Sequence, residues 1–341
     1  MTEPIRPPDA DVAAAARRMS DGQAKPLGAL GELEALGAWL AACEGVCPPR
    51  QLDDVRVVVF AGDHGVSASG VSAYPAAITP AMVRGIAAGV AGISALARAN
   101  QVSVSIYDVG VAADFDDLDP EISRFKIRRG SGSIDVEDAL SVAEVEAALA
   151  AGDTIAAEAV AGGAQLLIAG DLGIGNTTVA AALIAATYGL PAAAVTGRGT
   201  GIDDAALEHK TAVIDAALAR VGGRLGPIER LAAVGSADMA AAVGFMLGAA
   251  RRGVPVLLDG VIAVAEAVVA ASIDPGVRDW LQAGHRSTEP GQSVALLRLG
   301  LSPLVDLRLR LGEGTGAVVA VPILRAAVAA LTDIAQLADL T

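Results

Sequence analysis

The sequence predicts an α/β protein built on a doubly wound, Rossmann-like and mostly parallel sheet. Short apolar runs rich in β-branched residues alternate with Ala-rich stretches of helical length along much of the 341 residues. Strands that are apolar throughout are typical of parallel sheets covered by helices on both faces. The runs that we interpret as strands are 55–60, 102–109, 165–169, 231–234 and 254–258.

The chain ends differ from its middle and suggest a second, smaller unit. Helical spacing of apolar residues predicts helices over 10–19, 32–43, 80–99, 142–161, from 176 to about 188, and 317–337. The segment 278–292 is polar and irregular, and no strand separates the helices near either end. We therefore expect a large α/β domain at 48–270. A small helical domain is expected from 1–47 plus 271–341.

The composition excludes several classes of partner. A net charge of −14 repels nucleic acid and anionic membranes. The longest apolar stretch, 254–272, is interrupted by Asp259 and Glu266, so we predict no membrane span. The two cysteines, Cys43 and Cys47, predict neither a disulfide framework nor a metal site, which fits a cytoplasmic protein.

Two glycine-rich segments are candidate phosphate-binding loops. The segment 170–178 reads GDLGIGNTT and leads from a predicted strand into a helix, where backbone N–H groups can meet an anion. An ordinary strand-to-helix turn capped by Asn176 or Thr177 is an equal alternative. The segment 196–201 reads TGRGTG, and Lys210 follows it. Such a loop suits a phosphate in an otherwise acidic protein, although a flexible surface loop is the alternative.

Two carboxylate-bearing segments are candidates for acid–base chemistry. Glu313 stands between two glycines in the run LGEGTG, with apolar residues on both sides. Glycine lets a backbone approach a ligand closely, and apolar surroundings raise a carboxyl pKa, so Glu313 is a candidate base. Asp63 and His64 follow a strand, where we expect them to hydrogen-bond loop backbone rather than to catalyse.

The chain resembles the nicotinate-nucleotide–dimethylbenzimidazole phosphoribosyltransferases (CobT family) of cobalamin biosynthesis. The resemblance runs in order through most of the sequence and rests on seven segments. These are KPLGALG at 25–31, FAGDHGV at 60–66, GVSAYP at 70–75, GIGNTT at 173–178, GRGTG at 197–201, and the pair Asp259-Gly260 with 309–317. The resemblance implies transfer of phosphoribose from nicotinate mononucleotide to 5,6-dimethylbenzimidazole, giving α-ribazole 5′-phosphate and nicotinate, without cofactor or metal.

The resemblance also implies roles for individual residues. Glu313 would remove a proton from the attacking base, and Asp171 would be a second catalytic carboxylate. The phosphoribosyl group would be held by Gly173, Gly175, Asn176, Gly199, Thr200, Gly201, Lys210 and Ser287. The base would lie against Ser72, Tyr74, Met82 and Leu311. A homodimer is also implied.

Departures from the family pattern concern mainly the base pocket. Ala81 stands where the family usually has Gln, and Asp171 and Asp238 stand where it usually has Glu. The preferred base therefore stays open. A non-catalytic protein that binds a nucleotide or cobamide precursor on the same scaffold is the alternative. A dehydrogenase is disfavoured because no dinucleotide fingerprint follows the first strand.

Overall fold

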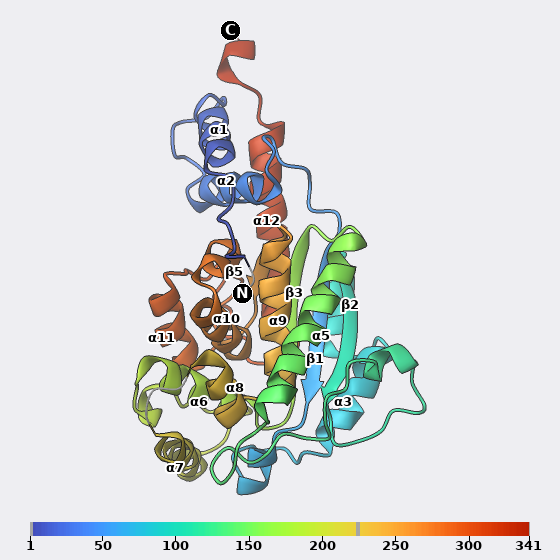
Figure 1. Ribbon diagram of the computed structural model, residues 1–341. Helices are drawn as coiled ribbons and strands as arrows, with labels where there is room; N and C mark the ends of the chain where they lie inside the picture. Colours follow the sequence, from blue (N-terminus) through green and yellow to red (C-terminus); the bar gives the residue numbers. More distant parts are fainter. Residues whose placement is uncertain (1–2, 223–225, 341) are drawn as a thin grey trace.

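The computed structural model describes residues 3–222 and 226–340. At its centre lies a five-stranded sheet in which all neighbouring strands are parallel, in the order β2-β1-β3-β4-β5 (Figure 1). The strands are β1 (Val55–Gly62), β2 (Ser103–Gly110), β3 (Leu166–Leu172), β4 (Val256–Leu258) and β5 (Leu281–Ala283). The predicted α/β class and parallel sheet are confirmed.

The side chains of β1 alternate between two hydrophobic cores. Val58 and Phe60 belong to one core, whereas Val57 and Val59 belong to the other. Successive side chains of a strand point to opposite faces of the sheet. Because helices cover both faces, the strand is apolar at nearly every position, with Arg56 near its start as the exception.

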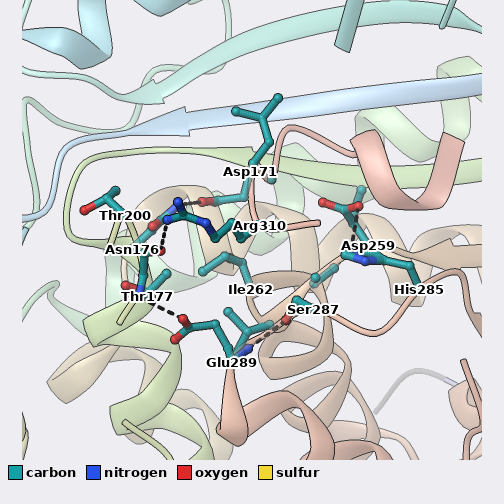
Figure 2. Close-up of a pocket in the computed structure, with 17 residues that line it drawn as sticks. Asp171, Asn176, Thr177, Thr200, Asp259, Ile262, His285, Ser287, Glu289 and Arg310 are labelled. Carbon is teal, nitrogen blue, oxygen red and sulfur yellow. Dashed lines mark hydrogen bonds and ion pairs between the residues drawn. The ribbon is translucent and has the colours of Figure 1, made fainter. Parts of the chain in front are cut away.

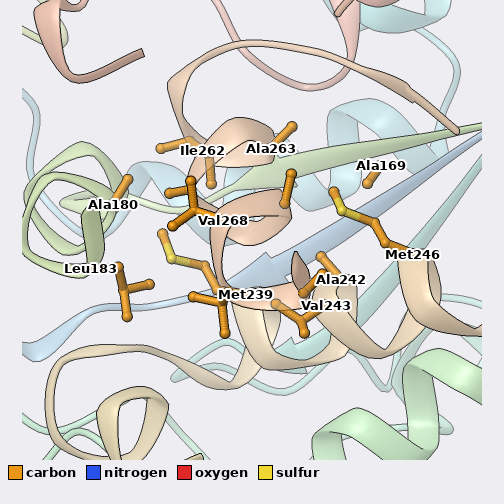
Figure 3. Packing of buried hydrophobic residues seen from close by; sticks show 14 of the residues in the cluster. Ala169, Ala180, Leu183, Met239, Ala242, Val243, Met246, Ile262, Ala263 and Val268 are labelled. Carbon is orange, nitrogen blue, oxygen red and sulfur yellow. The ribbon is translucent and has the colours of Figure 1, made fainter. Parts of the chain in front are cut away.

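One core lies between the sheet and a layer of Ala-rich helices. Figure 3 shows Ala169 of β3 among side chains of three of these helices, including Leu183, Met246 and Val268. The helices of this layer are α5 (Val142–Ala161), α6 (Asn176–Tyr188), α9 (Ala237–Arg251) and α10 (Val261–Ile273). Their small side chains allow the helix axes to come close.

The contact between α5 and α9 shows how close this packing is. A Cβ placed on Gly152 of α5 would lie 1.8 Å from the carbonyl oxygen of Ala241. One on Gly244 of α9 would lie 2.1 Å from the carbonyl oxygen of Leu149. The two backbones therefore touch, which only glycine permits at these positions.

The other face is covered by α3 (Ile78–Ala87), α4 (Gly92–Ala99) and the first part of α12 (Thr315–Asp333). The later part of α12 lies beside α1 (Ala10–Asp21) and α2 (Glu32–Glu44) (Figure 1), and Leu331 forms a separate small core with them. The helices α1 and α2 match the predicted ones closely. The segment 271–341 also supplies β5 to the sheet, and the division into two domains stays a prediction.

Three expectations about elements are corrected. The run 231–234 is not a strand but the end of α8 (Pro227–Val234), because a short buried apolar run has the same pattern in either element. The helix expected at 80–99 is two helices that end and begin around Gly89, where φ is +72°. The short strand β5 lies in a stretch that looked irregular. The other helices are α7 (Asp204–Val221) and α11 (Pro290–Leu299).

Two helical stretches, 78–99 and 315–333, are long and apolar enough to cross a membrane by length and composition alone. The first is divided between α3 and α4, and both stretches place side chains in the core beneath the sheet. In α12, 56% of the apolar window is buried within the fold. Packing within the fold, mainly against α2 and α4, therefore accounts for its hydropathy.

Candidate active site

The carboxyl ends of the strands meet at one edge of the sheet and carry the polar segments. Asp171 ends the run of β3, Asp259 follows β4, and His285 follows β5. A pocket of about 620 Å³ that opens to solvent lies at this edge (Figure 2). Ligands of open parallel sheets bind at this edge. The pocket is lined by Ala169, Asp171, Asn176, Thr177, Gly199, Thr200, Asp259, Gly260, Val261, Ile262, Ala263, His285, Ser287, Glu289, Arg310, Leu311 and Gly312.

Glu313 follows this lining directly and is 3% exposed. Its backbone is left-handed, with φ of +63°, a conformation that non-glycine residues rarely adopt. The carboxylate oxygen Oε2 accepts a hydrogen bond of 3.1 Å from the backbone N–H of Ile93, at the start of α4. Burial raises the pKa of Glu313, and the charge of Asp259 raises it further, while the Ile93 hydrogen bond opposes both.

The backbone of Glu313 lies directly against β3. A Cβ placed on Gly170 would lie 2.6 Å from the Glu313 carbonyl oxygen and 3.1 Å from the nitrogen of Gly314. The Glu313 N–H also donates to the carbonyl oxygen of Asp171 at 3.3 Å. The loop that carries Glu313 is therefore held by the strand that also carries Asp171.

Asp259 anchors the same loop from β4. Its carboxylate accepts hydrogen bonds from the backbone N–H groups of Gly314 (3.1 Å), Gly316 (2.8 Å) and Ala317 (3.0 Å), at the start of α12. The ring nitrogen Nε2 of His285 lies 3.4 Å from Asp259 Oδ1. Burial acts to raise the pKa of Asp259, but His285 and these N–H groups outweigh it and lower the pKa. An ionised Asp259 therefore complements the positive end of the helix.

The first predicted phosphate loop forms the start of α6. Gly175 precedes the helix with φ of +97°, a backbone that only glycine adopts readily. The side-chain amide of Asn176 donates to Asp171 Oδ1 at 2.7 Å. Asn176 and Thr177 both line the pocket, so the N-terminus of α6 faces the cavity. This arrangement suits an anion.

The second predicted loop meets the first through Lys210, which is fully buried on α7. Its ammonium group donates to Thr177 Oγ1 at 2.8 Å and to the carbonyl oxygen of Gly197 at 3.1 Å. Burial lowers the pKa of Lys210 to about 8, although the nearby charge of Glu289 acts in the opposite direction. Lys210 therefore ties both glycine loops together and supplies positive charge behind them.

Two charged residues at the loops were not anticipated from the sequence. Glu289 is 6% exposed and accepts a hydrogen bond of 2.8 Å from the N–H of Gly199. Arg310, at the pocket mouth, reaches the carbonyl oxygen of Gly199 at 3.5 Å (Figure 2). Arg310 comes only two residues before Gly312 in the run LRLGEG, and this position was the one available sequence indication of its role.

The structure brings about half of the predicted binding residues to the pocket wall. Those that line it are Asp171, Asn176, Gly199, Thr200, Ser287 and Leu311. Behind the wall lie Gly173, Gly175, Gly201 and Lys210.

Of the residues predicted to hold the base, Leu311 lines the pocket and Ser72 lies next to its wall. Thr200 Oγ1 is 3.4 Å from Ser72 Oγ, so the 72–74 loop touches the pocket through Thr200. Tyr74 is 54% exposed and Leu311 58% exposed, whereas Met82 packs partly into the core.

The expectation for His64 is wrong, whereas that for Asp63 is confirmed. Asp63 Oδ2 accepts a hydrogen bond of 2.9 Å from the backbone N–H of Ala112. The ring of His64 instead faces a carboxylate, with Nε2 3.3 Å from Asp238 Oδ2 at the start of α9. His64 and Asp238 are distant in sequence, so only the sheet's topology places them together.

Comparison with known proteins agrees with this geometry. A family model described as a phosphoribosyltransferase matches residues 5–340. A nicotinate-nucleotide–dimethylbenzimidazole phosphoribosyltransferase of Mycolicibacterium paratuberculosis is 54% identical over 336 residues, 98% of this chain and 96% of the relative. A relative of the same name from Mycobacterium tuberculosis is 54% identical over 337 residues, covering 98% and 93% of the two chains.

The solved structures agree with the sequence relatives. The crystal structure of CobT from Thermus thermophilus matches with a TM-score of 0.93 and 45% identity, over 97% of this chain and 98% of that chain. A second structure, of nicotinate-nucleotide–dimethylbenzimidazole phosphoribosyltransferase from the same organism, has a TM-score of 0.92 and 44% identity, with the same coverage. The chain therefore belongs to the CobT family of phosphoribosyltransferases.

Proposed function

We propose that this enzyme transfers phosphoribose from nicotinate mononucleotide to 5,6-dimethylbenzimidazole or a related base, with Glu313 as the general base. The products are α-ribazole 5′-phosphate and nicotinate. The names of the relatives support this reaction, and the pocket offers the groups that it requires. The observation that carries the proposal is a buried carboxylate of raised pKa, held at a pocket that two glycine loops border.

The chemistry needs a base but no acid for the leaving group. Nicotinate is bonded to ribose as a positively charged pyridinium and leaves as a neutral ring. As one benzimidazole nitrogen bonds to the anomeric carbon, positive charge develops on the azole. A carboxylate that removes the proton from the other ring nitrogen relieves that charge. Attack on the face opposite to the departing nicotinate inverts the anomer.

Glu313 suits this task in its hydrogen bonding as well as its burial. Oε2 is held by the Ile93 N–H, and no hydrogen bond within the described residues holds Oε1. The raised pKa brings Glu313 closer to the pKa of a neutral azole's conjugate acid, which makes proton transfer more favourable. The left-handed backbone and the contact with Gly170 fix the position of the Glu313 backbone, from which the carboxylate side chain extends.

The phosphoribosyl group is anionic, whereas the chain has a net charge of −14. We place its phosphate near the start of α6, where backbone N–H groups, Lys210 and Arg310 supply local positive potential. Gly173, Gly175, Asn176, Gly199, Thr200, Gly201 and Ser287 complete the proposed cradle. The flat base then lies over Leu311, toward Ser72, Tyr74 and Met82.

We propose that Asp171 holds neighbouring groups in position, a narrower role than that of a second base. Its carboxyl group accepts from Asn176 and its backbone carbonyl from Glu313, so it links the phosphate loop to the base. We also propose a cytoplasmic homodimer. Sedimentation at micromolar concentration tests the dimer, and a monomer would contradict it.

The decisive experiment follows nicotinate release by chromatography when the protein is given nicotinate mononucleotide and dimethylbenzimidazole. The wild type should form α-ribazole 5′-phosphate. Glu313→Gln keeps an acceptor for the Ile93 N–H but cannot take a proton, so turnover should fall by about 100-fold or more. Nicotinate mononucleotide should still bind, as calorimetry will show.

The same experiment separates the enzyme from a non-catalytic binding protein. A panel of benzimidazoles, purines and phenols replaces dimethylbenzimidazole in turn. Tight nucleotide binding without product from any base would favour the binding protein. Wild-type turnover in the Gln variant would instead remove Glu313 from the mechanism and leave the reaction standing.

A further inference from the structure

A buried cluster of titratable groups lies behind the pocket wall at Asp171. His64 follows β1, Asp171 is the next-to-last residue of β3, and Asp238 is the second residue of α9. One possible ligand atom from each lies within 4.8 Å of the other two. The three residues are 1%, 6% and 0% exposed, and Asp171 is the member that borders the pocket.

The polar atoms of this cluster lack ordinary partners. Within the described residues, no hydrogen bond of normal geometry reaches Asp171 Oδ2 or either carboxylate oxygen of Asp238. The His64 ring approaches Asp238 at 3.3 Å, and the hydroxyl group of Ser236 also interacts with the Asp238 carboxylate. The described lysine and arginine side chains form no ion pair with either carboxylate. Two unpaired buried negative charges side by side would be strongly unfavourable.

We propose that Asp171 and Asp238 share one proton, carried on Asp171 Oδ2, and that with His64 they form a positioning cluster for the active site. The proton makes Asp171 a donor to Asp238, while His64 Nε2–H donates to the other side of Asp238. One proton thus turns two facing acceptors into a donor and an acceptor. It also leaves one negative charge in the cluster where there would be two.

The energetics of the two carboxyl groups agree with this placement of the proton. Burial, followed by the charges of Asp238 and Glu266, raises the pKa of Asp171 well above its ordinary value. Asp238 is equally buried, which opposes ionisation, but the His64 beside it lowers its pKa. Asp171 is therefore the member of the pair that binds a shared proton more tightly.

The cluster acts on the reaction through Asn176 and Glu313. A protonated Asp171 still accepts from the Asn176 amide at 2.7 Å through Oδ1, while Oδ2–H fixes the carboxyl plane against Asp238. Asn176 is the first residue of α6, where we place the phosphoribosyl group. The Asp171 carbonyl oxygen accepts from the Glu313 N–H. His64 and Asp238 thereby orient both halves of the site without touching the substrate.

Other titratable groups face this region and must be distinguished from Asp171. Glu266 of α10 is 1% exposed, and its pKa is raised well above the ordinary value by burial, then by Asp238 and Asp259. It is the other buried carboxyl group of this region that could hold a proton. Lys210 has a pKa of about 8, so its loss of charge above that pH should change the reaction rate whatever the state of Asp171. A pH–rate profile alone therefore does not isolate the shared proton.

Infrared difference spectroscopy of the intact enzyme detects the proton directly, without reference to activity. At pH 7.5 the wild type should show the C=O stretch of protonated carboxyl groups. Asp171→Asn should remove one component of that band, and Glu266→Gln, the matched control, should remove a different one. If Asp171→Asn leaves the band unchanged, Asp171 is ionised and the proposal is overturned.

Rescue by an isosteric amide tests the positioning role, and this arm rests on the proposed function. Asp171→Ala should lower kcat/KM for nicotinate mononucleotide by about 100-fold. Asp171→Asn should regain at least about tenfold of that loss, because its amide oxygen accepts from Asn176 and its N–H replaces the carboxyl O–H. A reaction that needs an ionised Asp171 would leave the Asn variant as poor as the Ala variant, which would overturn the role.

Elemental analysis tests whether a metal ion, and not a proton, occupies the cluster. The same three atoms could hold a metal ion in place of a proton, since imidazole and carboxylate are common metal ligands. Purified enzyme should contain no stoichiometric metal that Asp238→Asn removes, and finding one would overturn the shared proton. Should the wild type release no nicotinate at all, the proposed function fails, and the infrared result still decides the shared proton.

Discussion

Replacing Gly170 by alanine tests whether the position of Glu313 depends on its contact with β3. The added Cβ would lie 2.6 Å from the Glu313 carbonyl oxygen and 2.7 Å from its carbonyl carbon. Optimal separations between such atoms are about 3.5–4.0 Å. The loop must therefore retreat by roughly 0.9 Å or more, because backbone atoms on both sides cannot rotate away.

That retreat acts on the hydrogen bonds at the start of α12. Asp259 binds the N–H of Gly316 at 2.8 Å and that of Gly314 at 3.1 Å. A shift of roughly 0.9 Å along these bonds takes both beyond about 3.5 Å, where they no longer count as hydrogen bonds. We expect a stability loss of about 1–3 kcal/mol from overpacking. Turnover should fall by about 100-fold, since a displacement near 1 Å has that effect on positioned groups.

The assay compares kcat for nicotinate release with the free energy of unfolding in urea. Gly110→Ala is the matched control, because Gly110 likewise lies near the carboxyl end of a strand but its added Cβ meets Ala237 at an ordinary 3.4 Å. The control should keep wild-type kcat. If Gly170→Ala is folded by circular dichroism and turns over within threefold of the wild type, the backbone contact does not position Glu313.

Three further predictions follow from single residues. Lys210 loses its charge as the pH rises through about 8, so kcat/KM for nicotinate mononucleotide should fall in that range, and Lys210→Met should abolish this dependence along with most of the binding. Asp259→Asn should destabilise the fold by about 2–4 kcal/mol in urea unfolding, because charge-assisted hydrogen bonds to α12 are lost. Gly85→Ala in α3 meets nothing within 4 Å and should stabilise the protein by up to about 1 kcal/mol in thermal unfolding; a loss would contradict the helix assignment.

The sequence predicted the sheet where local pattern and environment agree. The run 55–60 is long, β-branched and followed by a glycine segment, and it lies in β1, apolar on both faces. The prediction of a strand at 231–234 was wrong because four buried apolar residues fit either a strand or a helix. In the structure, Pro227 starts a helix that ends with these residues. The strand β5 failed because Leu281–Ala283 is too short to show a period.

The loops of the candidate site could be predicted from the sequence, but the residues that hold these loops in place could not. Glycine segments after strands indicate the edge of the sheet where ligands bind, because the carboxyl ends of parallel strands lie at the same edge. The pair Asp259-Gly260 follows the predicted strand 254–258 and marked this edge, but its hydrogen bonds to the start of α12 were not predicted. Glu289 gave no indication, since a single carboxylate after a turn is usually exposed to water. Its role arises only because the start of α11 reaches the loop 197–201, where Glu289 binds the N–H of Gly199. Such contacts depend on topology, which local pattern does not contain.

The proposed role of Glu313 makes stability and catalysis depend on the same residues. The two candidate phosphate loops lie at the end of β3 and the start of α6, and in the turn before α7, whereas Glu313 comes from the segment that enters α12. A base delivered by a separate segment is useful only if that segment is fixed relative to the sheet. Asp259 from β4, the Asp171 carbonyl and bare Gly170 from β3 provide that fixation. Changes that loosen α12 should therefore lower turnover before they unfold the sheet.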